Sequence, residues 1–348
     1  MKAAVLRAGQ MIVDDVPDPV PGDGQVLVQT KACGICGSDL HAAQHAERMV
    51  ELTKEATASA GGGMAPIVFE TGRDLVMGHE FAAEVLELGP GTAGVSPGQT
   101  VVSLPVVADQ RGIHAVGYSN DYPGGYAERM LLSAGLVLQV PNGLDARRAA
   151  LTEPMAVGVH AVHRSAITPG TAALVIGAGP VGLAVIAALR LKGIEPVVAA
   201  DFSSRRRKLA RTMGAHEVVD PREEPAIDAW RRVDGRHPLV IFEAVGVPGV
   251  IDQAMRAAPQ QTEIVVVGVC METDRLQPFM GITKELTVKF SMAYDPMEFA
   301  STLQSIAEGA LDVSPLITGT VGIDGVPQAF ADLANPDTHA KIVVEPGG

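Results

Sequence analysis

The glycine-rich motif Gly177-Ala178-Gly179-Pro180-Val181-Gly182 constrains the fold of this chain more than any other part of its sequence. It follows the apolar run Ala173–Ile176 and opens the apolar helical pattern Val181–Lys192. In such a turn the first glycine permits a tight bend, the second lets a pyrophosphate approach the backbone, and the third lets helix pack on strand. The helix N-terminus then offers free N–H groups to phosphates. The motif predicts a dinucleotide-binding strand–turn–helix.

From Thr171 onward, strand and helix patterns alternate along the chain. Six apolar runs predict strands at 173–176, 196–200, 217–219, 239–242, 263–267 and 286–290. Helical patterns such as Arg205–Met213 lie between most of them. Six strands joined by crossover helices predict a Rossmann-type, doubly wound parallel sheet in an α/β protein. We expect this dinucleotide-binding domain to span residues 155–291.

Asp201 ends the second predicted strand, where a carboxylate is placed to accept hydrogen bonds from the adenosine ribose hydroxyls. A carboxylate also repels a 2′-phosphate, which favours NAD over NADP. The cluster Arg205–Arg207 could instead pair with that phosphate; its plainer interpretation is a solvated helix face, with Arg206 covering the adenine. We give Asp201 more weight. A buried contact between its carboxylate and a 2′-phosphate would cost more free energy than a mobile surface arginine contributes.

Up to about residue 150, short apolar runs alternate with turn signals, which is typical of small antiparallel sheets or a distorted barrel. The runs are 26–32, 81–88, 100–104 and 136–140. His41–Ala58 is charged, alanine-rich and free of breakers, so it predicts a helix that Ala60–Gly63 ends. Near the C-terminus we expect a helix at Pro296–Glu308 and a closing strand at Lys341–Val344. We expect residues 1–154, completed by 292–348, to form a second, β-rich domain.

Polar side chains with ligand chemistry gather at three places in this β-rich half. Cys33-Gly34-Ile35-Cys36-Gly37-Ser38-Asp39-Leu40-His41 holds two thiols, a hydroxyl, an acid and an imidazole within nine residues. Gly78-His79-Glu80 and Thr152-Glu153-Pro154 add an imidazole and two carboxylates. A structural zinc would need a second cysteine pair, which the sequence lacks. A redox Cys-x-x-Cys belongs at a helix start in a thioredoxin-like sheet, which this region does not predict.

In order and spacing, these motifs resemble the zinc-containing medium-chain dehydrogenase/reductase (alcohol dehydrogenase) family. The resemblance is strongest to its sorbitol, butanediol and threonine dehydrogenase branch, and it runs through nearly the whole chain. The shared segments are Cys36-Gly-Ser-Asp-x-His41, Gly78-His79-Glu80, Glu153-Pro154, the glycine-rich motif, Gly124–Glu128, Gly246–Gly249 and Pro315–Thr318. The resemblance implies a GroES-like β-rich catalytic domain together with the Rossmann domain.

The family pattern implies that Cys36 and His79 ligate zinc and that Glu153 takes the third ligand position. Glu80 is expected beside the metal, binding it directly or exchanging with water. A thiolate, a neutral imidazole and a carboxylate roughly neutralise Zn²⁺ and leave one coordination position for substrate. We expect Asp39 to orient the His79 ring from behind.

The implied reaction is reversible oxidation of an alcohol to a ketone or aldehyde, with hydride transfer to NAD. Zinc would lower the pKa of the alcohol, and the proton would leave through Ser38, the nicotinamide ribose and His41. Val157 and Val181 are expected to press on the nicotinamide ring. The alternatives for Ser38 and His41 are a plain turn residue and a plain helix-start residue.

Other residues are expected to have structural roles only. Cys33 lies outside the family's ligand position, and His160, His163 and His216 have no motif around them, so we expect surface or packing roles. Classical relatives carry four cysteines for a structural zinc in a lobe corresponding to about residues 90–125. This chain has no cysteine there, which predicts one catalytic zinc and no structural zinc.

The substrate is the least constrained inference. The apolar segment Met64–Val76 and the helix before it are expected to shape one wall of the pocket. Polyol-specific relatives carry an arginine near Ser291–Tyr294, and its absence here weakens a sorbitol assignment. We favour a secondary alcohol or a vicinal diol. Two rival hypotheses are a zinc-free quinone or enoyl reductase of the same superfamily and a non-catalytic dinucleotide-binding protein.

Composition excludes two classes of partner. The net charge of −13 argues against nucleic acid, because phosphate binding needs a basic face. The uncharged stretch between Arg164 and Arg190 is long enough for a bilayer, but its prolines and glycines fit a buried strand–turn–helix better. Three cysteines predict no disulfide framework and a reducing cytoplasm. The resemblance implies a homodimer or homotetramer paired through the last Rossmann strand, near Leu286–Phe290.

Overall fold

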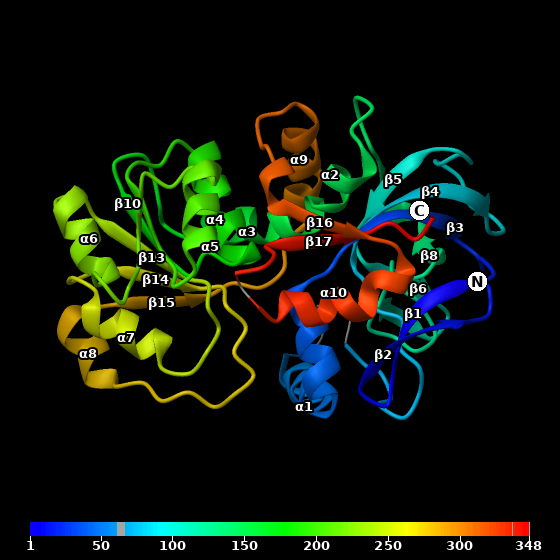
Figure 1. The fold of residues 1–348 in the computed structure, drawn as a ribbon, viewed down its shortest axis with the longest axis horizontal. Coiled ribbons are helices and arrows are strands. Elements are labelled where there is room, and N and C mark those ends of the chain that lie inside the picture. The colour runs from blue at the N-terminus through cyan, green and yellow to red at the C-terminus, as the bar shows by residue number, and fades with distance from the viewer. Residues whose placement is uncertain (61–66, 336, 348) are drawn as a thin grey trace. The chain divides into compact units, whose positions relative to one another are not determined.

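The computed structural model describes residues 1–60, 67–335 and 337–347 and divides into two compact units. The first unit comprises Met1–Glu153, Ile317–Asn335 and the C-terminal segment from Lys341, and the second comprises Pro154–Leu316 with the short stretch before Lys341. Figure 1 traces the chain by colour. The glycines predicted to end the first helix, and the start of the Met64–Val76 segment, lie outside the described residues.

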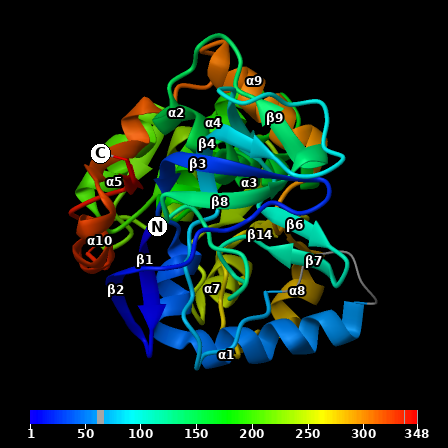
Figure 2. The ribbon, with the colours of Figure 1, turned by 90° about the vertical axis from the view of Figure 1, so that its right-hand side faces the viewer.

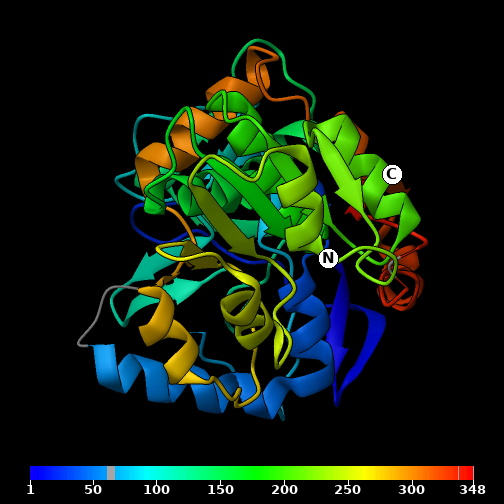
Figure 3. The same ribbon diagram turned by 90° about the vertical axis from the view of Figure 1, so that its left-hand side faces the viewer.

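The second unit contains a six-stranded parallel sheet in the order β12-β11-β10-β13-β14-β15 (Figure 3). Its strands are β10 (Ala172–Ile176), β11 (Val197–Ala200), β12 (Glu217–Val219), β13 (Leu239–Glu243), β14 (Glu263–Val266) and β15 (Thr287–Phe290). This confirms the predicted doubly wound sheet and its six strands. The strand order reverses between β10 and β13, and ligands of such sheets bind at the carboxyl ends of the strands beside that point.

Helices cover both faces of this sheet. They are α3 (Thr152–Arg164), α4 (Pro180–Leu191), α5 (Ser204–Met213), α6 (Ala226–Val233), α7 (Val250–Ala257), α8 (Pro278–Lys284) and α9 (Pro296–Ala307). On one face, Trp230 of α6 and Met255 of α7 belong to a buried cluster with Leu174 and Ile241 of the sheet. Gly158 lets α3 approach α4, because a Cβ there would lie 2.4 Å from the carbonyl carbon of Ala184.

The first unit is built on a seven-stranded sheet, in which the path β16-β17-β3-β4-β5-β9 is joined by β8 on β3; Figure 1 labels most of these strands and Figure 2 adds β9. Its strands are β3 (Gln25–Gly34), β4 (Glu80–Leu88), β5 (Thr100–Ser103), β8 (Arg129–Ser133), β9 (Val137–Gln139), β16 (Ile317–Val321) and β17 (Lys341–Val344). Only the β16–β17 pair is parallel among these described strands. The predicted closing strand therefore lies inside the sheet, between β16 and β3.

Smaller elements complete the first unit. The hairpins are β1 (Lys2–Arg7) with β2 (Gln10–Asp15) and β6 (Val106–Asp109) with β7 (Gly112–Ala115), and the helices are α1 (Gly37–Ala60), α2 (Ala146–Ala150) and α10 (Val326–Leu333). Short 3₁₀ turns lie at Ala134–Leu136 and Ile323–Gly325, with another at Ser314–Leu316 in the second unit. Within the described part of the chain, no helix is both long and apolar enough to cross a bilayer.

Two boundaries differ from those expected. Helix α1 begins at Gly37, before the predicted His41, and its backbone leaves helical geometry at His45 (φ −137°, ψ 39°). The first unit resumes at Ile317 rather than at residue 292. The reason is that Glu298 of α9 binds His160 and His163 of α3, which ties α9 to the second unit.

Candidate functional site

Cys36 stands immediately before α1, and a reciprocal pair of bonds fixes it there. The Cys36 backbone N–H donates to Asp39 Oδ2 at 3.0 Å, and the Asp39 N–H donates to the Cys36 carbonyl at 3.2 Å. A side chain in the first turn that reaches back to the residue before the helix is one half of a capping box. The local sequence therefore determines the place of the Cys36 backbone at the helix start.

A glycine positions His79, the next residue of the site. Gly78 has φ +104°, and a Cβ there would lie 2.9 Å from Cys33 Sγ and 2.8 Å from the Tyr126 ring, so glycine is required. Glu80 follows as the first residue of β4 and is fully buried. A second glycine makes room for its carboxylate, since a Cβ on Gly34 would lie 2.1 Å from Glu80 Oε2.

Cys36, His79 and Glu80 form a trio of ligand-bearing residues that could hold a metal ion. One ligand atom from each residue lies within 4.8 Å of the other two, and no other such group of three occurs among the described residues. His79 and Glu80 are buried, while Cys36 is partly exposed. Sulfur, nitrogen and oxygen donors together suit zinc, and three protein ligands leave a position for substrate. The residues present therefore fit the expected metal.

Lys341, the first residue of β17, is buried against this trio. Its Nζ donates to both carboxylate oxygens of Glu80 at 2.7 Å and to the Ile35 carbonyl at 3.0 Å. Burial alone would lower the pKa of Lys341, but the nearby charges of Glu80, Cys36 and Glu153 outweigh burial and raise it. Glu153 thus lies close enough to act on Lys341, although it is not part of the trio. Sequence reasoning missed Lys341. Its only sequence signal is that it is a charged residue at the first position of an otherwise apolar strand.

Asp39 lies behind the His79 ring. Its Oδ1 is 3.4 Å from His79 Nδ1, and that nitrogen has no closer hydrogen-bond partner in the described chain. Burial alone would lower the pKa of His79, but the charges of Asp39 and Cys36 raise it well above its usual value. This negative potential favours a cation at the trio. With Asp39 facing Nδ1, the other ring nitrogen of His79 is the one left to meet a metal.

Two tyrosines also face Asp39, and sequence reasoning missed both. Tyr126 Oη donates to Asp39 Oδ2 at 2.5 Å. Tyr118 Oη lies 2.9 Å from Asp39 Oδ1 and 2.9 Å from Ser38 Oγ. Burial, followed by the charge of Asp39, raises the pKa of both phenols well above the usual value, so both keep their protons. Tyr126 lies in the Gly124–Glu128 segment shared with the family, which was its only sequence signal.

The remaining predicted residues of this half have distinct environments. Ser38 lies in the first turn of α1 and is partly exposed. His41 follows on the same helix, and burial and then the charge of His45 lower its pKa, so its ring is neutral at neutral pH. Cys33 is fully buried, and burial, followed by the charge of Asp39, raises the pKa of its thiol. A neutral, enclosed thiol is poorly suited to ligate metal.

The glycine-rich motif has the backbone shape that phosphate binding requires. Gly177 has φ +92°, and a Cβ on Gly182 would lie 2.0 Å from the Gly177 carbonyl oxygen, so neither position tolerates a side chain. At Gly179 a Cβ would meet only the Arg206 guanidinium, at 3.7 Å or more, which leaves the backbone open to a ligand. Pro180 opens α4 as its first residue, and the free N–H groups of this helix start suit a phosphate.

Asp201 is bound to the glycine-rich turn. Its Oδ2 accepts the Ala178 N–H and its Oδ1 accepts the Ser203 N–H, both at 2.8 Å. Arg206 Nη1 lies 3.9 Å from Asp201 Oδ2. Arg207 points elsewhere, because its Nη1 donates to the carbonyls of Asp201 and Phe202. Of the arginine cluster, Arg206 is therefore the member placed over the turn.

Six buried polar side-chain atoms among the described residues of the second unit have no hydrogen-bond partner: Arg206 Nε, Trp230 Nε1, Glu243 Oε2, Asp274 Oδ2, Ser291 Oγ and Thr302 Oγ1. Glu243 ends β13, Ser291 follows β15, and Asp274 lies in the segment between β14 and α8. Buried polar groups are normally hydrogen-bonded, so unpartnered groups at strand ends fit a polar ligand such as a dinucleotide.

The other predicted residues of the second unit lie on helices or in loops. Val157 on α3 and Val181 on α4 are half-buried. His216 Nδ1 accepts the Val197 N–H at 3.0 Å, which is a packing role. His160 and His163 do more than the expected packing, because their Nδ1 atoms bind the two oxygens of Glu298 at 2.7 and 2.9 Å.

Comparison with known proteins identifies the family. A family model described as alcohol dehydrogenase GroES-like domain matches residues 22–142, and one described as zinc-binding dehydrogenase matches residues 180–308. The chain is 31% identical to the (R,R)-butanediol dehydrogenase of Bacillus subtilis, over 99% of this chain and 100% of that protein. It is 30% identical to the (R,R)-butanediol dehydrogenase of Neisseria gonorrhoeae, over 99% of each.

Solved structures agree with the sequence relatives. The crystal structure of 2R,3R-butanediol dehydrogenase from Bacillus subtilis matches with a TM-score of 0.83 at 30% identity, covering 99% of each chain. A zinc-binding dehydrogenase from Sinorhizobium meliloti, bound to NADP, has the same TM-score of 0.83 at 27% identity and the same coverage of 99%. Neither rival hypothesis is favoured by these relatives. The chain therefore belongs to the zinc-containing medium-chain dehydrogenase/reductase family and is an alcohol dehydrogenase.

Proposed function

We propose that this enzyme reversibly oxidises a secondary alcohol or a vicinal diol to the corresponding ketone, with NAD as hydride acceptor. The observation that carries the proposal is the trio of Cys36, His79 and Glu80 in a chain whose second unit holds a dinucleotide-binding turn. The butanediol dehydrogenases that resemble it over their full length support a diol or a secondary alcohol. Lys341, the cation against the trio, is already paired with Glu80, so it offers no charge to an acidic substrate.

Cys36 and His79 would hold a single catalytic zinc, with Glu80 or Glu153 as the carboxylate ligand. The bound metal would supply a Lewis acid that lowers the pKa of the alcohol, and the nicotinamide would accept the hydride. Lys341 neutralises part of the negative charge that two glutamates bring to this site. We propose no structural zinc, since residues 90–125 contain no cysteine.

Side chains of the first unit would transfer the hydroxyl proton of the alcohol to solvent. Ser38 Oγ would accept the hydroxyl proton of the alcohol. The ring of His41, neutral at neutral pH, would take up a proton and release it to solvent. Asp39 would hold the His79 ring through Nδ1, so that the opposite nitrogen keeps one direction.

The second unit would hold the dinucleotide. The phosphates would bind at the start of α4, and Asp201, only 9% exposed, favours a free ribose over a 2′-phosphate. The proposed contacts are Gly177, Gly179, Pro180, Val181, Gly182, Asp201, Arg206 and Val157. Arg206 would cover the adenine, and the two valines would face the nicotinamide.

We also propose that the enzyme is a homodimer or homotetramer of a reducing cytoplasm. Strand β15 is a sheet edge, and large apolar side chains are exposed on it and near it: Phe279, Ile282, Phe290 and Met292. An open strand edge with exposed apolar residues favours pairing with another copy. All three cysteines are free thiols, which suits a reducing compartment.

A substrate screen tests the proposal directly. NAD reduction would be followed with primary alcohols, secondary alcohols, vicinal diols, polyols and hydroxy acids, and zinc would be measured on the same sample. We expect the highest kcat/KM for a secondary alcohol or diol, and about one zinc per chain. Two zincs per chain would contradict the single-site proposal, and NADH binding without turnover on any alcohol would favour a non-catalytic protein.

Three substitutions test the metal ligands. Cys36→Ser should lose zinc and nearly all turnover while still binding NADH, and unchanged turnover would rule out the metal mechanism. Glu80→Gln and Glu153→Gln identify the third ligand, because only the ligating carboxylate should weaken zinc binding by tenfold or more. Glu80→Gln also leaves the buried Lys341 ammonium without its carboxylate, so NADH binding is measured on both variants to show that each still folds.

A further inference from the structure

Asp220 is a nearly buried carboxylate at the carboxyl end of the parallel sheet. It directly follows β12, and only 7% of the residue is exposed. Arg207 Nη1 donates to its Oδ2 at 3.0 Å, and Arg222 Nε donates to its Oδ1 at 2.8 Å. The hydrogen bonds from Arg222 hold the pKa of Asp220 well below its usual value, so the carboxylate is ionised at neutral pH. One carboxylate therefore holds two guanidinium groups.

The same two arginines also bind the main chain that follows β11. Arg207 Nη1 donates to the carbonyls of Asp201 and Phe202, at 2.8 and 2.9 Å. Arg222 Nη2 donates to the Phe202 carbonyl at 2.8 Å, and its guanidinium lies over the Phe202 ring, 5.5 Å from the ring centroid. Both guanidinium groups thus connect the Asp220 carboxylate to two consecutive peptide groups.

Asp201 uses its side chain for a different set of contacts. Its Oδ2 accepts the Ala178 N–H of the glycine-rich turn, and its Oδ1 accepts the Ser203 N–H, both at 2.8 Å. The N–H of Asp201 donates to the Val219 carbonyl at 3.2 Å. The backbone of Asp201 is therefore fixed through both its N–H and its carbonyl, and this fixed backbone aims the carboxylate at the glycine-rich turn.

The bonds to these carbonyls depend on the charge of Asp220. The Arg222 side chain is 64% exposed, so without a carboxylate partner water would compete with the Phe202 carbonyl for its N–H groups. The Arg207 side chain is only 20% exposed, and burial of a guanidinium without a counter-ion is unfavourable. Loss of the Asp220 charge would therefore loosen both arginines and let the peptide groups of Asp201 and Phe202 rotate.

We propose that Asp220 is a positioning residue that aims the Asp201 carboxylate at the ribose of bound NAD. It acts through Arg207 and Arg222. The inference rests on the proposed function, in which Asp201 accepts hydrogen bonds from the ribose hydroxyls. Asp220 takes no part in hydride or proton transfer. Its effect is on cofactor affinity and on the choice between the free ribose of NAD and the 2′-phosphate of NADP.

Asp220→Asn tests this role, because it removes the charge and keeps the size of the side chain. We expect the Kd for NADH, measured without alcohol, to rise about tenfold, which corresponds to roughly 1.4 kcal/mol. The KM for NAD should rise with it, and kcat at saturating NAD should stay within about twofold of the wild-type value. An unchanged Kd for NADH would overturn the inference.

NADPH distinguishes a positioning role from a general loss of structure. NADPH lacks the free 2′-hydroxyl that Asp201 would bind, so it loses less affinity when the carboxylate is misplaced. We expect the Kd for NADPH to change by less than about threefold in Asp220→Asn. A disordered loop would weaken the binding of both cofactors, so equal losses for NADH and NADPH would overturn the proposal.

Arg222→Met provides a second variant with little risk to folding, because this side chain is largely exposed. It removes the N–H groups that bind Asp220 and the Phe202 carbonyl, so the Kd for NADH should rise about threefold. In the cofactor-free protein, hydrogen exchange of the Ala178 amide should be faster in both variants, because this N–H donates to Asp201. Exchange at the wild-type rate in both variants would contradict the inference.

Glu217→Gln is a matched control in the same strand. Glu217 opens β12, at the end opposite to Asp220. It pairs with Arg211 and Arg232, at 3.3 and 3.2 Å. The variant should leave the Kd for NADH within about twofold, because exposed ion pairs contribute little. A loss as large as that of Asp220→Asn would show that any missing charge on this strand has the effect, and the proposal would fail.

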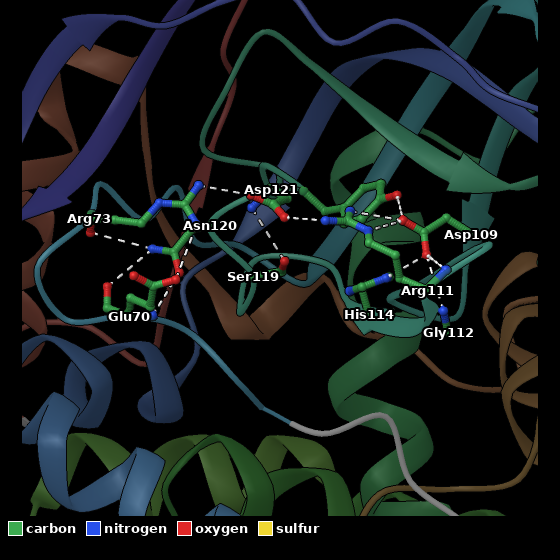
Figure 4. A network of polar contacts seen from close by, with 10 residues as sticks. Glu70, Arg73, Asp109, Arg111, Gly112, His114, Ser119, Asn120 and Asp121 are labelled. Atoms are coloured by element: carbon green, nitrogen blue, oxygen red, sulfur yellow. Dashed lines mark hydrogen bonds and ion pairs between the residues drawn. The ribbon is translucent and has the colours of Figure 1, made fainter.

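Asp121→Asn makes the identical substitution in the first unit. Asp121 pairs with Arg73 and with Arg111, both at 2.8 Å, so this carboxylate also joins two arginines (Figure 4). All three residues belong to the first unit. The Kd for NADH should again stay within about twofold. Weakening equal to that of Asp220→Asn would refute a specific role for Asp220.

A double-mutant cycle with Asp201→Ala identifies the route of the effect. If Asp220 acts through Asp201, Asp220→Asn should cause no further loss of NADH affinity in the Asp201→Ala background. A further loss of about tenfold in that background would overturn the inference while leaving the proposed function intact. Failure of the proposed function is visible separately, as a wild-type protein without NADH binding or without alcohol turnover.

Discussion

At the scale of single residues, Lys341 brings a buried positive charge against Glu80. A buried ammonium and a buried carboxylate compensate each other, and removing one partner leaves an unpaired charge that costs about 3–5 kcal/mol. Lys341 is 2% exposed and Glu80 is fully buried. A metal at the trio would offer Glu80 a second partner, so the cost of losing Lys341 depends on the metal.

Lys341→Met is expected to destabilise the metal-free protein by about 3 kcal/mol, and the zinc-loaded protein by clearly less. Denaturant unfolding with a chelator and with zinc measures both values. Lys289→Met is the matched control, because Lys289 pairs with Glu263 at 3.0 Å in the second unit. Its effect should not depend on zinc. Equal losses for Lys341→Met in both states would contradict the assignment.

Asp201 is the residue that should set cofactor preference. Asp201→Gly removes the carboxylate beside the glycine-rich turn and leaves Arg206 in place. We expect the ratio of kcat/KM for NADP over NAD to rise at least about tenfold, which corresponds to roughly 1.4 kcal/mol. Initial rates with each cofactor, at saturating alcohol, give the ratio. A wild-type enzyme that reduces NADP faster than NAD at equal concentration would refute this role.

Sequence reasoning identified the residues of the site that stand in short motifs and missed those that arrive from elsewhere. Cys36 and His79 stand in motifs shared with the family, and their role as metal ligands stays a prediction. Tyr118 and Lys341 could not be placed beside them from the sequence, because only a loop and a strand that enters the middle of a sheet bring them there. Only the fold makes them neighbours of Ser38 and Glu80.

At the scale of elements, the junction of α3 and α9 is the least expected feature. The buried Glu298 caps its own helix start through Asp295 and accepts from His160 and His163 on α3. Burial alone would raise the pKa of Glu298, but the Asp295 N–H and the two histidines outweigh it and lower the pKa. Both α3 and α9 therefore depend on one ionised carboxylate.

The sign of the pH dependence follows from that lowered pKa. Glu298 contributes stability above its ordinary pKa of 4.5, and this contribution is lost as the pH falls through the lower folded value. Thermal unfolding should show a fall in Tm below about pH 4.5 that Glu298→Gln reduces by roughly 2–4 °C. Glu308→Gln, at the exposed end of the same helix, is the control. An identical acid response in all three proteins would rule out this linkage.

Buried strands were predicted from the sequence more accurately than partly exposed ones. The inner strands β10, β11, β13 and β14 are covered on both faces and read as largely apolar runs, whereas the edge strands β12 and β15 are partly exposed; all six were predicted. The hairpin strands β2 and β7 are only partly buried and their apolar runs are short, so they were missed. The geometry of α1 at His45 was not predictable, because no proline or glycine marks it.

At the scale of the whole molecule, the proposed assembly depends on the sheet edge at β15. Phe290, at the end of this strand, is 65% exposed. Phe290→Glu places a charge where two copies would pair, so we expect light scattering to show monomers instead of dimers or tetramers. Val233→Glu, on exposed α6 surface in the same unit, should leave the mass unchanged. A wild-type protein that is already monomeric would disprove pairing through this edge.

The position of β17 in the sheet has a consequence for how the enzyme is made. A ribosome delivers Cys36 and His79 early and Lys341 only after the whole nucleotide-binding unit, which can complete its own sheet first. Until that last strand slots between β16 and β3, the carboxylate of Glu80 lacks its counter-ion. Synthesis therefore supplies Cys36, His79 and Glu80 early and Lys341 near the end. A nascent chain arrested before residue 341 would contain these three side chains but not the strand that packs Lys341 against Glu80.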